Sequence, residues 1–413
     1  MPKKPTCLSR RNFIKTTATA GIATAFAGSK ALGGAEKTNT GPQGNVKPVP
    51  TRPFGKTGVD VSILSFGGSQ NLVSRQLLLR QALKLGVTYW DTARRYRNSE
   101  DGIGKYFSRY PDDRQKVFLV SKTESSIPED MDRDLAESLD KLKTDYLDLY
   151  FVHMVSNVKN DLDKSVQKWA EKAKASGKIR FFGFSTHTNM EGCLLEGAKL
   201  GYIDAIMASY NYRLMHSDKM KKAVDACIKA GIGLTAMKTQ APFMARFYAT
   251  VGKENEIASN MTDQFVKKGF TEEQAKLKVV WDNPQISSIC SEMPNMTILL
   301  ANVAAAAGKT KLTQQETDLL KKYAFETSSQ YCAGCADICQ STLAAKMPVA
   351  DVMRYLMYAN GYGELERSRR LFNRIDPGIR RDLVAVDYKM AEKRCPQNLP
   401  IARLMQEATE ILA

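Results

Sequence analysis

Short apolar runs alternate with amphipathic stretches along the chain from residue 51 onward. Runs of about four to eight apolar or β-branched residues are typical of buried strands, whereas longer stretches with an apolar residue every three or four positions indicate helices. The strand-like runs are Val61–Phe66, Thr88–Ala93, Val117–Lys122, Leu147–His153, Arg180–Ser185, Ala205–Tyr210, Gly233–Lys238 and Ile286–Ser291. The helix-like stretches between them include Ser74–Leu85, Met131–Leu142, Asp163–Ser176, Met190–Leu200, Ser217–Ala230 and Thr271–Asn283.

This alternation predicts an α/β fold. Strands that alternate with helices form parallel βαβ units, and eight of them within about 250 residues match a (β/α)8 TIM barrel. An open, doubly wound sheet is the alternative, but its first turn normally carries more glycine than Gly67-Gly68. We therefore predict a barrel over residues 51–310. The long segment 243–270 follows the seventh strand, where we expect a lid or a wall of the substrate site.

The alternation ends near residue 311. Thr313 is a good helix cap for a stretch that runs through Tyr323, and no strand pattern follows it. Further helices are expected at Val349–Asn360, Glu364–Ile375 and Leu399–Leu412. Residues 311–413 are therefore predicted to form a separate, all-helical, cysteine-containing extension.

The first 35 residues resemble an export signal. The run Ser9-Arg10-Arg11-Asn12-Phe13-Ile14-Lys15 is similar to the twin-arginine motif, and a weakly apolar stretch rich in small residues follows it. A disordered basic tail is the alternative. We expect residues 1–35 to engage the twin-arginine export machinery and to deliver the protein to the periplasm or another extracytoplasmic space. Residues 36–50, with several glycines and prolines, are expected to be a flexible linker.

Composition adds only a few limits. The formal net charge is +16, and residues 1–35 carry six basic and no acidic side chains. No apolar run reaches the roughly 18 residues that a membrane-spanning helix needs, so no transmembrane segment is expected. The chain lacks a recognisable nucleic-acid-binding motif, so no nucleic-acid partner is expected. The basic surface is either simply solvated or attracts an acidic partner.

Four polar residues stand at or after neighbouring strand ends: Asp91, Tyr96, Lys122 and His153. Reactive residues of such barrels gather at the carboxyl ends of the strands, so we expect these four to meet at one mouth. A carbonyl that accepts a hydride needs a proton on its oxygen. The lysine ammonium lowers a nearby tyrosine pKa, the aspartate holds the lysine, and the histidine donates a hydrogen bond to the substrate oxygen. Each residue alone has a structural explanation, but their convergence indicates a catalytic set.

Several motifs make the chain similar to the aldo-keto reductases over residues 51–305. They are Phe54-Gly55-Lys56-Thr57-Gly58, Phe66-Gly67-Gly68, Gly86-Val87-Thr88-Tyr89-Trp90-Asp91-Thr92-Ala93 with Tyr96, Asp148-Leu149-Tyr150 with His153, and Gly183-Phe184-Ser185. The resemblance implies a nicotinamide-dependent oxidoreductase that acts on a small carbonyl or alcohol. It also implies that Asp91, Tyr96, Lys122 and His153 form the catalytic tetrad, with Tyr96 as the acid.

The same resemblance implies where the cofactor binds. The implied contacts are Ser185, Thr186, Tyr210, Lys238, Ser291 and Asn302, with Ser185 at the nicotinamide amide and Asn302 at the adenine. The chain departs from the family where Thr186 replaces an asparagine and Met207 replaces a glutamine. Glu292 and Ile298 stand where basic contacts to a 2′-phosphate are usual. We therefore expect NAD(P)(H), with NAD preferred over NADP.

Four cysteines form a group in the helical extension. Cys332, Cys335 and Cys339 lie within eight residues, and Cys395 is followed by a proline. Such spacing is typical of iron–sulfur ligation, and four thiolates suffice for one [4Fe–4S] cluster. A zinc site and a metal-free site or disulfide pair are the alternatives. The region resembles the ferredoxin-like extension of a subgroup of aldo-keto reductases, which implies the cluster.

Three functional classes follow from these patterns. The first is an exported enzyme that transfers hydride to a carbonyl or from an alcohol. The second passes electrons from the barrel through the cluster to an acidic partner. The partner would dock on Arg367, Arg370 and Arg374, which are predicted to share one helical face. A face that is simply solvated is the alternative for these arginines. The third is a catalytically weak or inactive barrel that serves as a binding subunit, because fold alone does not prove activity.

Overall fold

A computed structural model describes residues 47–244, 264–265, 267–344 and 346–413. The predicted export signal and almost all of the predicted linker lie outside the described residues. The same holds for most of the predicted lid segment 243–270.

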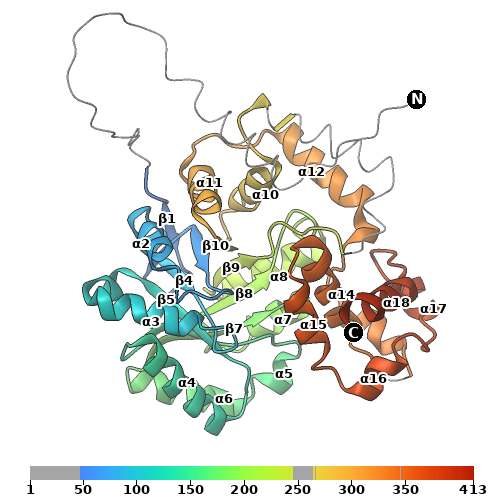
Figure 1. Ribbon diagram of the computed structural model, residues 1–413, viewed down its shortest axis with the longest axis horizontal. Coiled ribbons are helices and arrows are strands. Elements are labelled where there is room, and N and C mark those ends of the chain that lie inside the picture. Colours follow the sequence, from blue (N-terminus) through green and yellow to red (C-terminus); the bar gives the residue numbers. More distant parts are fainter. Residues whose placement is uncertain (1–46, 245–263, 266, 345) are drawn as a thin grey trace, which may run out of the picture.

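The barrel prediction is confirmed. Eight parallel strands close into a barrel in the order β10-β3-β4-β5-β6-β7-β8-β9, with helices packed around it (Figure 1). The closure excludes the open sheet. The barrel strands are β3 (Leu64–Gly67), β4 (Tyr89–Asp91), β5 (Phe118–Thr123), β6 (Leu147–Val152), β7 (Ile179–Thr186), β8 (Ala205–Ser209), β9 (Gly233–Met237) and β10 (Ser288–Glu292).

The first predicted strand is divided in two. Its beginning, β2 (Asp60–Ser62), pairs with β1 (Thr51–Pro53) in an antiparallel hairpin, and only its second half is barrel strand β3. Phe54 in the hairpin is fully buried and packs edge-on against Tyr89 and Phe118, which begin β4 and β5. The hairpin therefore closes the amino end of the barrel and leaves the carboxyl end for chemistry.

The outer helices cover the barrel strands with amphipathic faces. In α4, for example, Met131, Leu135 and Leu142 are buried, as the three-and-four spacing predicts. The helices of the barrel are α2 (Gln76–Lys84), α3 (Ser99–Arg109), the 3-10 helix η1 (Pro111–Lys116), α4 (Pro128–Leu142), α5 (Val158–Asp161), α6 (Lys164–Ala175), α7 (Met190–Gly197), α8 (Asp218–Lys229), α10 (Glu272–Trp281) and α11 (Met296–Ala307).

After β10, the described residues contain helices and no strand. α12 begins with a capping box, in which the Thr313 and Glu316 side chains each bond the other's backbone N–H. The elements are α12 (Gln314–Glu326), η3 (Ser328–Gln330), α13 (Ala336–Cys339), η4 (Gln340–Thr342), α14 (Val349–Leu356), the π-helix η5 (Met357–Gly361), α15 (Leu365–Phe372), α16 (Pro377–Asp382), α17 (Lys389–Arg394) and α18 (Ile401–Leu412). Among the described residues, no helix is long and apolar enough to cross a bilayer.

The helical extension docks at the carboxyl end of the barrel (Figure 1). The backbone N–H of Asn189, after β7, donates to the Gly334 carbonyl at 2.7 Å. The Asn360 side chain donates to the carbonyl of Met244, after β9, at 2.7 Å. The extension therefore stands beside the mouth where the catalytic residues were predicted.

Candidate active site

Two predicted catalytic residues form a buried ion pair under the mouth of the barrel. Lys122 on β5 donates from Nζ to Asp91 Oδ1 on β4 at 2.5 Å and to the Thr92 carbonyl at 2.8 Å. Both charged side chains are almost fully buried. Burial lowers the pKa of Lys122 most strongly, but Asp91, Tyr96 and Cys290 together raise it above its usual value, so the lysine stays charged.

Tyr96 lies above this pair. It follows β4 in a tight turn, in which its N–H donates to the Ala93 carbonyl at 2.9 Å. Lys122 Nζ lies 5.1 Å from the centre of the Tyr96 ring. Burial raises the pKa of Tyr96 and Lys122 lowers it, with a net value of about 12. The lysine acts in the predicted direction, but a net decrease is wrong because burial disfavours the phenolate more strongly. The phenol is therefore protonated at neutral pH and can serve as an acid.

His153 completes the set just after β6. Its ring centre lies 5.8 Å from that of Tyr96, edge to face. Burial first, and then the charge of Lys122, hold the pKa of His153 well below its usual range. The neutral ring has a buried Nδ1 atom with no hydrogen-bond partner among the residues that the structure describes. A neutral imidazole beside the phenol can donate to or accept from a substrate oxygen without competing for its proton.

A cavity of about 1920 Å³ opens above these residues, and Asp91, Tyr96 and His153 line it. Ordinary ligand pockets measure about 300–1,000 Å³, so this cavity has room for a dinucleotide together with a substrate. The structure thus brings the four predicted catalytic residues together, with Lys122 just beneath the cavity floor.

The six predicted cofactor contacts divide into two groups. Lys238, Ser291 and Asn302 line the cavity, and Asn302 Nδ2 donates to Ser291 Oγ at 3.0 Å. Ser185, Thr186 and Tyr210 do not line it. Their hydroxyl groups are engaged elsewhere: Ser185 accepts from the Met154 N–H, Thr186 donates to the Thr188 carbonyl, and Tyr210 accepts from Asn283. Three predicted contacts therefore fit a cofactor in the cavity, and the other three lie beside or outside it.

Three further residues line the cavity, of which only Glu292 was named from the sequence, at a position where a 2′-phosphate contact is usual. His187, just after β7, lies with its ring 6.5 Å from that of His153, and burial followed by the charge of Lys238 keeps its pKa well below the usual range. The chain has only three histidines, so their scarcity was a usable signal. Cys290 on β10 also lines the cavity. Glu292 ends β10, and burial, with Glu364, raises its pKa to about 7.

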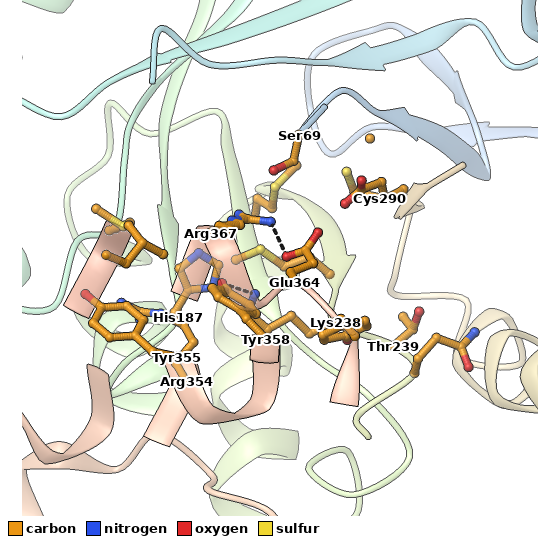
Figure 2. A pocket seen from close by; sticks show the side chains of 18 of the residues that line it. Ser69, His187, Lys238, Thr239, Cys290, Arg354, Tyr355, Tyr358, Glu364 and Arg367 are labelled. Carbon is orange, nitrogen blue, oxygen red and sulfur yellow. Dashed lines mark hydrogen bonds and ion pairs between the residues drawn. The ribbon is translucent and has the colours of Figure 1, made fainter. Parts of the chain in front are cut away.

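The helical extension builds one wall of the same cavity. Tyr358 on η5 accepts a hydrogen bond from Lys238 Nζ at 2.6 Å (Figure 2). Arg367 on α15 lies 4.6 Å from the Tyr358 ring centre and pairs with Glu364 at 2.8 Å. Burial raises the pKa of Tyr358, but the charges of Lys238, Arg367 and Arg354 outweigh it and bring the value down to about 8.

The four grouped cysteines line one small cavity inside the extension. All four are free thiols, so the disulfide alternative is wrong for this structure. Burial raises the pKa of Cys332, and the three other thiols raise it further, which reflects their proximity. Within the described residues, no group of three or more His, Cys, Asp or Glu side chains is arranged to hold a metal ion.

Comparison with known proteins identifies the family. A sequence model of the aldo/keto reductase family matches residues 64–323, well over half of the chain. The protein therefore belongs to the aldo/keto reductase family, a family of oxidoreductases.

Individual relatives are distant. An uncharacterized oxidoreductase of Bacillus subtilis, YrpG, is 25% identical over 280 residues, which cover 61% of this chain and 81% of that protein. The aldo-keto reductase str7 of Strobilurus tenacellus is 31% identical over 156 residues, which cover 33% of this chain and only 46% of str7. The aldo-keto reductase AKR11C1 of Bacillus halodurans aligns in three dimensions with a TM-score of 0.54 at 20% identity, over 67% of this chain and 96% of its own. That structural likeness shows the shared fold.

Proposed function

We propose that this protein transfers hydride between a nicotinamide cofactor and a carbonyl or alcohol substrate. The observation that carries the proposal is the buried Asp91–Lys122 pair beneath a protonated Tyr96 and a neutral His153. The cofactor would be held by Lys238, Ser291 and Asn302 in the cavity, and its nicotinamide would supply the hydride.

The protein's own residues supply the rest of the reaction. Tyr96 transfers its phenolic proton to the oxygen that becomes the alcohol, and the lysine ammonium stabilises the resulting phenolate. His153 fixes the substrate oxygen next to that hydroxyl by a hydrogen bond. Asp91 holds Lys122 charged and oriented, and in alcohol oxidation the same groups act in reverse.

The test is oxidation of NADH or NADPH by purified full-length protein with a panel of small aldehydes and ketones. Turnover that is lost in Lys122→Met but kept in a surface control, Lys143→Met, supports the proposal. Lys143 is an exposed lysine at the end of α4 that pairs with Asp140. Absence of turnover with every aldehyde and both cofactors overturns it.

The second part of the proposal concerns the cysteines. We propose that Cys332, Cys335, Cys339 and Cys395 hold one [4Fe–4S] cluster. The small cavity that all four cysteines line supports this, and four thiolates suffice for one such cluster. Anaerobic iron and sulfide analysis tests it, with about four irons per cluster expected. One zinc per chain, or no metal, would reject it.

The third part concerns export. The run from Ser9 to Lys15 supports delivery through the twin-arginine machinery. Residues 1–35 fused to a folded reporter should export it, and Arg10→Lys with Arg11→Lys should retain it inside the cell. Equal export of both fusions would contradict this part.

A binding subunit without significant catalysis is the second candidate. Ser185, Thr186 and Tyr210 do not line the cavity, which favours weak cofactor binding. Fluorescence titration with NADH and NADPH separates the two candidates, because a binding subunit of this kind would show neither tight cofactor binding nor turnover.

A further inference from the structure

Six arginines line the active-site cavity, and five of them form a group that includes both sequence neighbours of Tyr96. Two of these five flank the tyrosine in sequence, two come from α15 of the helical extension, and one lies in the turn that follows α15. They are Arg95, Arg97, Arg367, Arg370 and Arg374. The last three were predicted to share one helical face, and the structure turns that face toward the cavity.

These arginines are close enough to repel one another. Burial first, and then the charges of the other four arginines, lower the pKa of Arg370. Among the residues that the structure describes, no ion pair involves Arg97, Arg370 or Arg374. Like charges gathered without acidic partners cost free energy unless an anion compensates them.

Acidic residues are present but only partly offset this charge. Arg95 forms an ion pair with Glu124, and Arg367 with Glu364. Glu366 on α15 also lines the cavity, and its side chain is exposed. The three arginines without ion pairs therefore remain an available anion-binding group at the entrance.

We propose that the substrate carries a carboxylate or phosphate group, which Arg97, Arg370 and Arg374 bind while its carbonyl reaches Tyr96. The inference rests on the proposed carbonyl reduction and names its substrate class. Arginine forks match both oxyanions in geometry and stay charged at any physiological pH. Because Arg97 directly follows Tyr96, an anion held there lies within a short molecule's length of the acid.

The arrangement also explains why the extension stands at the barrel mouth. The charge of Arg367 reaches Tyr96 itself, so α15 is close to the reacting end of the cavity. The barrel supplies the proton donor, and the extension supplies most of the charge that selects the substrate.

The experiment compares three aldehydes of similar size: 4-carboxybenzaldehyde, 4-formylphenyl phosphate and methyl 4-formylbenzoate. For the wild-type enzyme, we expect kcat/KM for at least one anionic aldehyde to exceed that for the neutral ester by about tenfold or more. The better of the two anions identifies whether the site prefers carboxylate or phosphate. In the Arg97→Gln/Arg370→Gln double variant, this ratio should fall toward one, whereas Arg381→Gln, an exposed arginine on α16 outside the cavity, should keep it.

A binding measurement separates this inference from the proposed function. Terephthalate and phenyl phosphate are titrated calorimetrically against the wild type and the double variant, without any turnover. If no aldehyde is reduced but an anion binds and binding weakens in the double variant, the anion site stands and the carbonyl chemistry fails. A neutral ester turned over as well as both anions, or an anion preference unchanged in the double variant, overturns the anion site. Absence of anion binding also overturns it.

Discussion

The Nζ atom of Lys238, at the carboxyl end of the barrel, donates a 2.6 Å hydrogen bond to the hydroxyl of Tyr358 in the helical extension. The two residues are 120 positions apart in the chain. Their contact joins the barrel to the extension inside the active-site cavity, next to Arg367 (Figure 2).

This contact predicts a tyrosine that ionises unusually early. The pKa of Tyr358 is lowered to about 8, so one phenol should titrate near that pH in the folded protein. Ultraviolet absorbance of tyrosinate, measured against pH, should show this step in the wild type and lack it in Tyr358→Phe. An identical titration of both proteins below pH about 9 would refute the shift.

The lowered pKa of Tyr358 also makes the stability of the folded protein depend on pH. A folded pKa below the unfolded value of about 10 means that the folded state releases its proton first. The contribution of Tyr358 is therefore absent below pH about 8, rises between 8 and 10, and is complete above the unfolded value. Urea unfolding should show that the stability difference between wild type and Tyr358→Phe grows with pH in this window. A difference that shrinks there would contradict the assignment.

Tyr96→Phe should remove the proton donor and keep the fold. We expect a loss of roughly 100- to 10,000-fold in kcat, as for other single general acids. Tyr110→Phe is the matched control, because Tyr110 follows α3 away from the cavity. Wild-type carbonyl reduction by Tyr96→Phe would remove Tyr96 from the role of acid.

Lys122→Met should destabilise the protein as well as inactivate it. The substitution leaves the Asp91 carboxylate buried without its ion-pair partner, which typically costs about 3–5 kcal/mol. The double variant Asp91→Asn/Lys122→Met should recover part of this loss in denaturant unfolding, because no charge stays buried. If the double variant is no more stable than Lys122→Met, the unpaired Asp91 carboxylate is not the cause of the destabilisation.

Cofactor choice should depend on Glu292. Its pKa is raised to about 7, so above that pH its carboxylate repels a 2′-phosphate and below it the repulsion fades. We expect NADH to bind at least as tightly as NADPH, with a preference that increases as the pH rises through about 7 and is lost in Glu292→Gln. A clear NADPH preference in fluorescence titrations would instead assign the phosphate to a base such as Lys238 or Arg75, whose side chain reaches the Pro294 carbonyl in this loop.

Much of the fold could be predicted because each barrel strand and helix carries its own periodic pattern. The catalytic set followed from the same reasoning, since Asp91, Lys122 and His153 stand at strand ends that a closed barrel must bring together. Local pattern was also enough to predict Thr313 as a helix cap, although the reciprocal bond to Glu316 is a finding of the structure.

The other features of the site depend on side-chain orientation and on contacts between distant segments, which local sequence patterns do not predict. Side chains alternate along a strand, so one position decides whether a residue faces the cavity, and Tyr210 instead reaches Asn283. The predicted helix over residues 349–360 widens into the π-helical turn η5, which carries Tyr358. The contact between Tyr358 and Lys238 depends on how the helical extension docks on the barrel, and local sequence patterns do not predict that docking.

One wall of the cavity belongs to a segment that lies beyond the residues matched by the family as a whole. Mutations in α15 can therefore alter which molecules are admitted while the acid, its lysine and the barrel core stay untouched. Such a division lets selectivity evolve separately from reactivity. Grafting a different extension onto the same barrel should yield an enzyme with the same reaction and a different set of substrates.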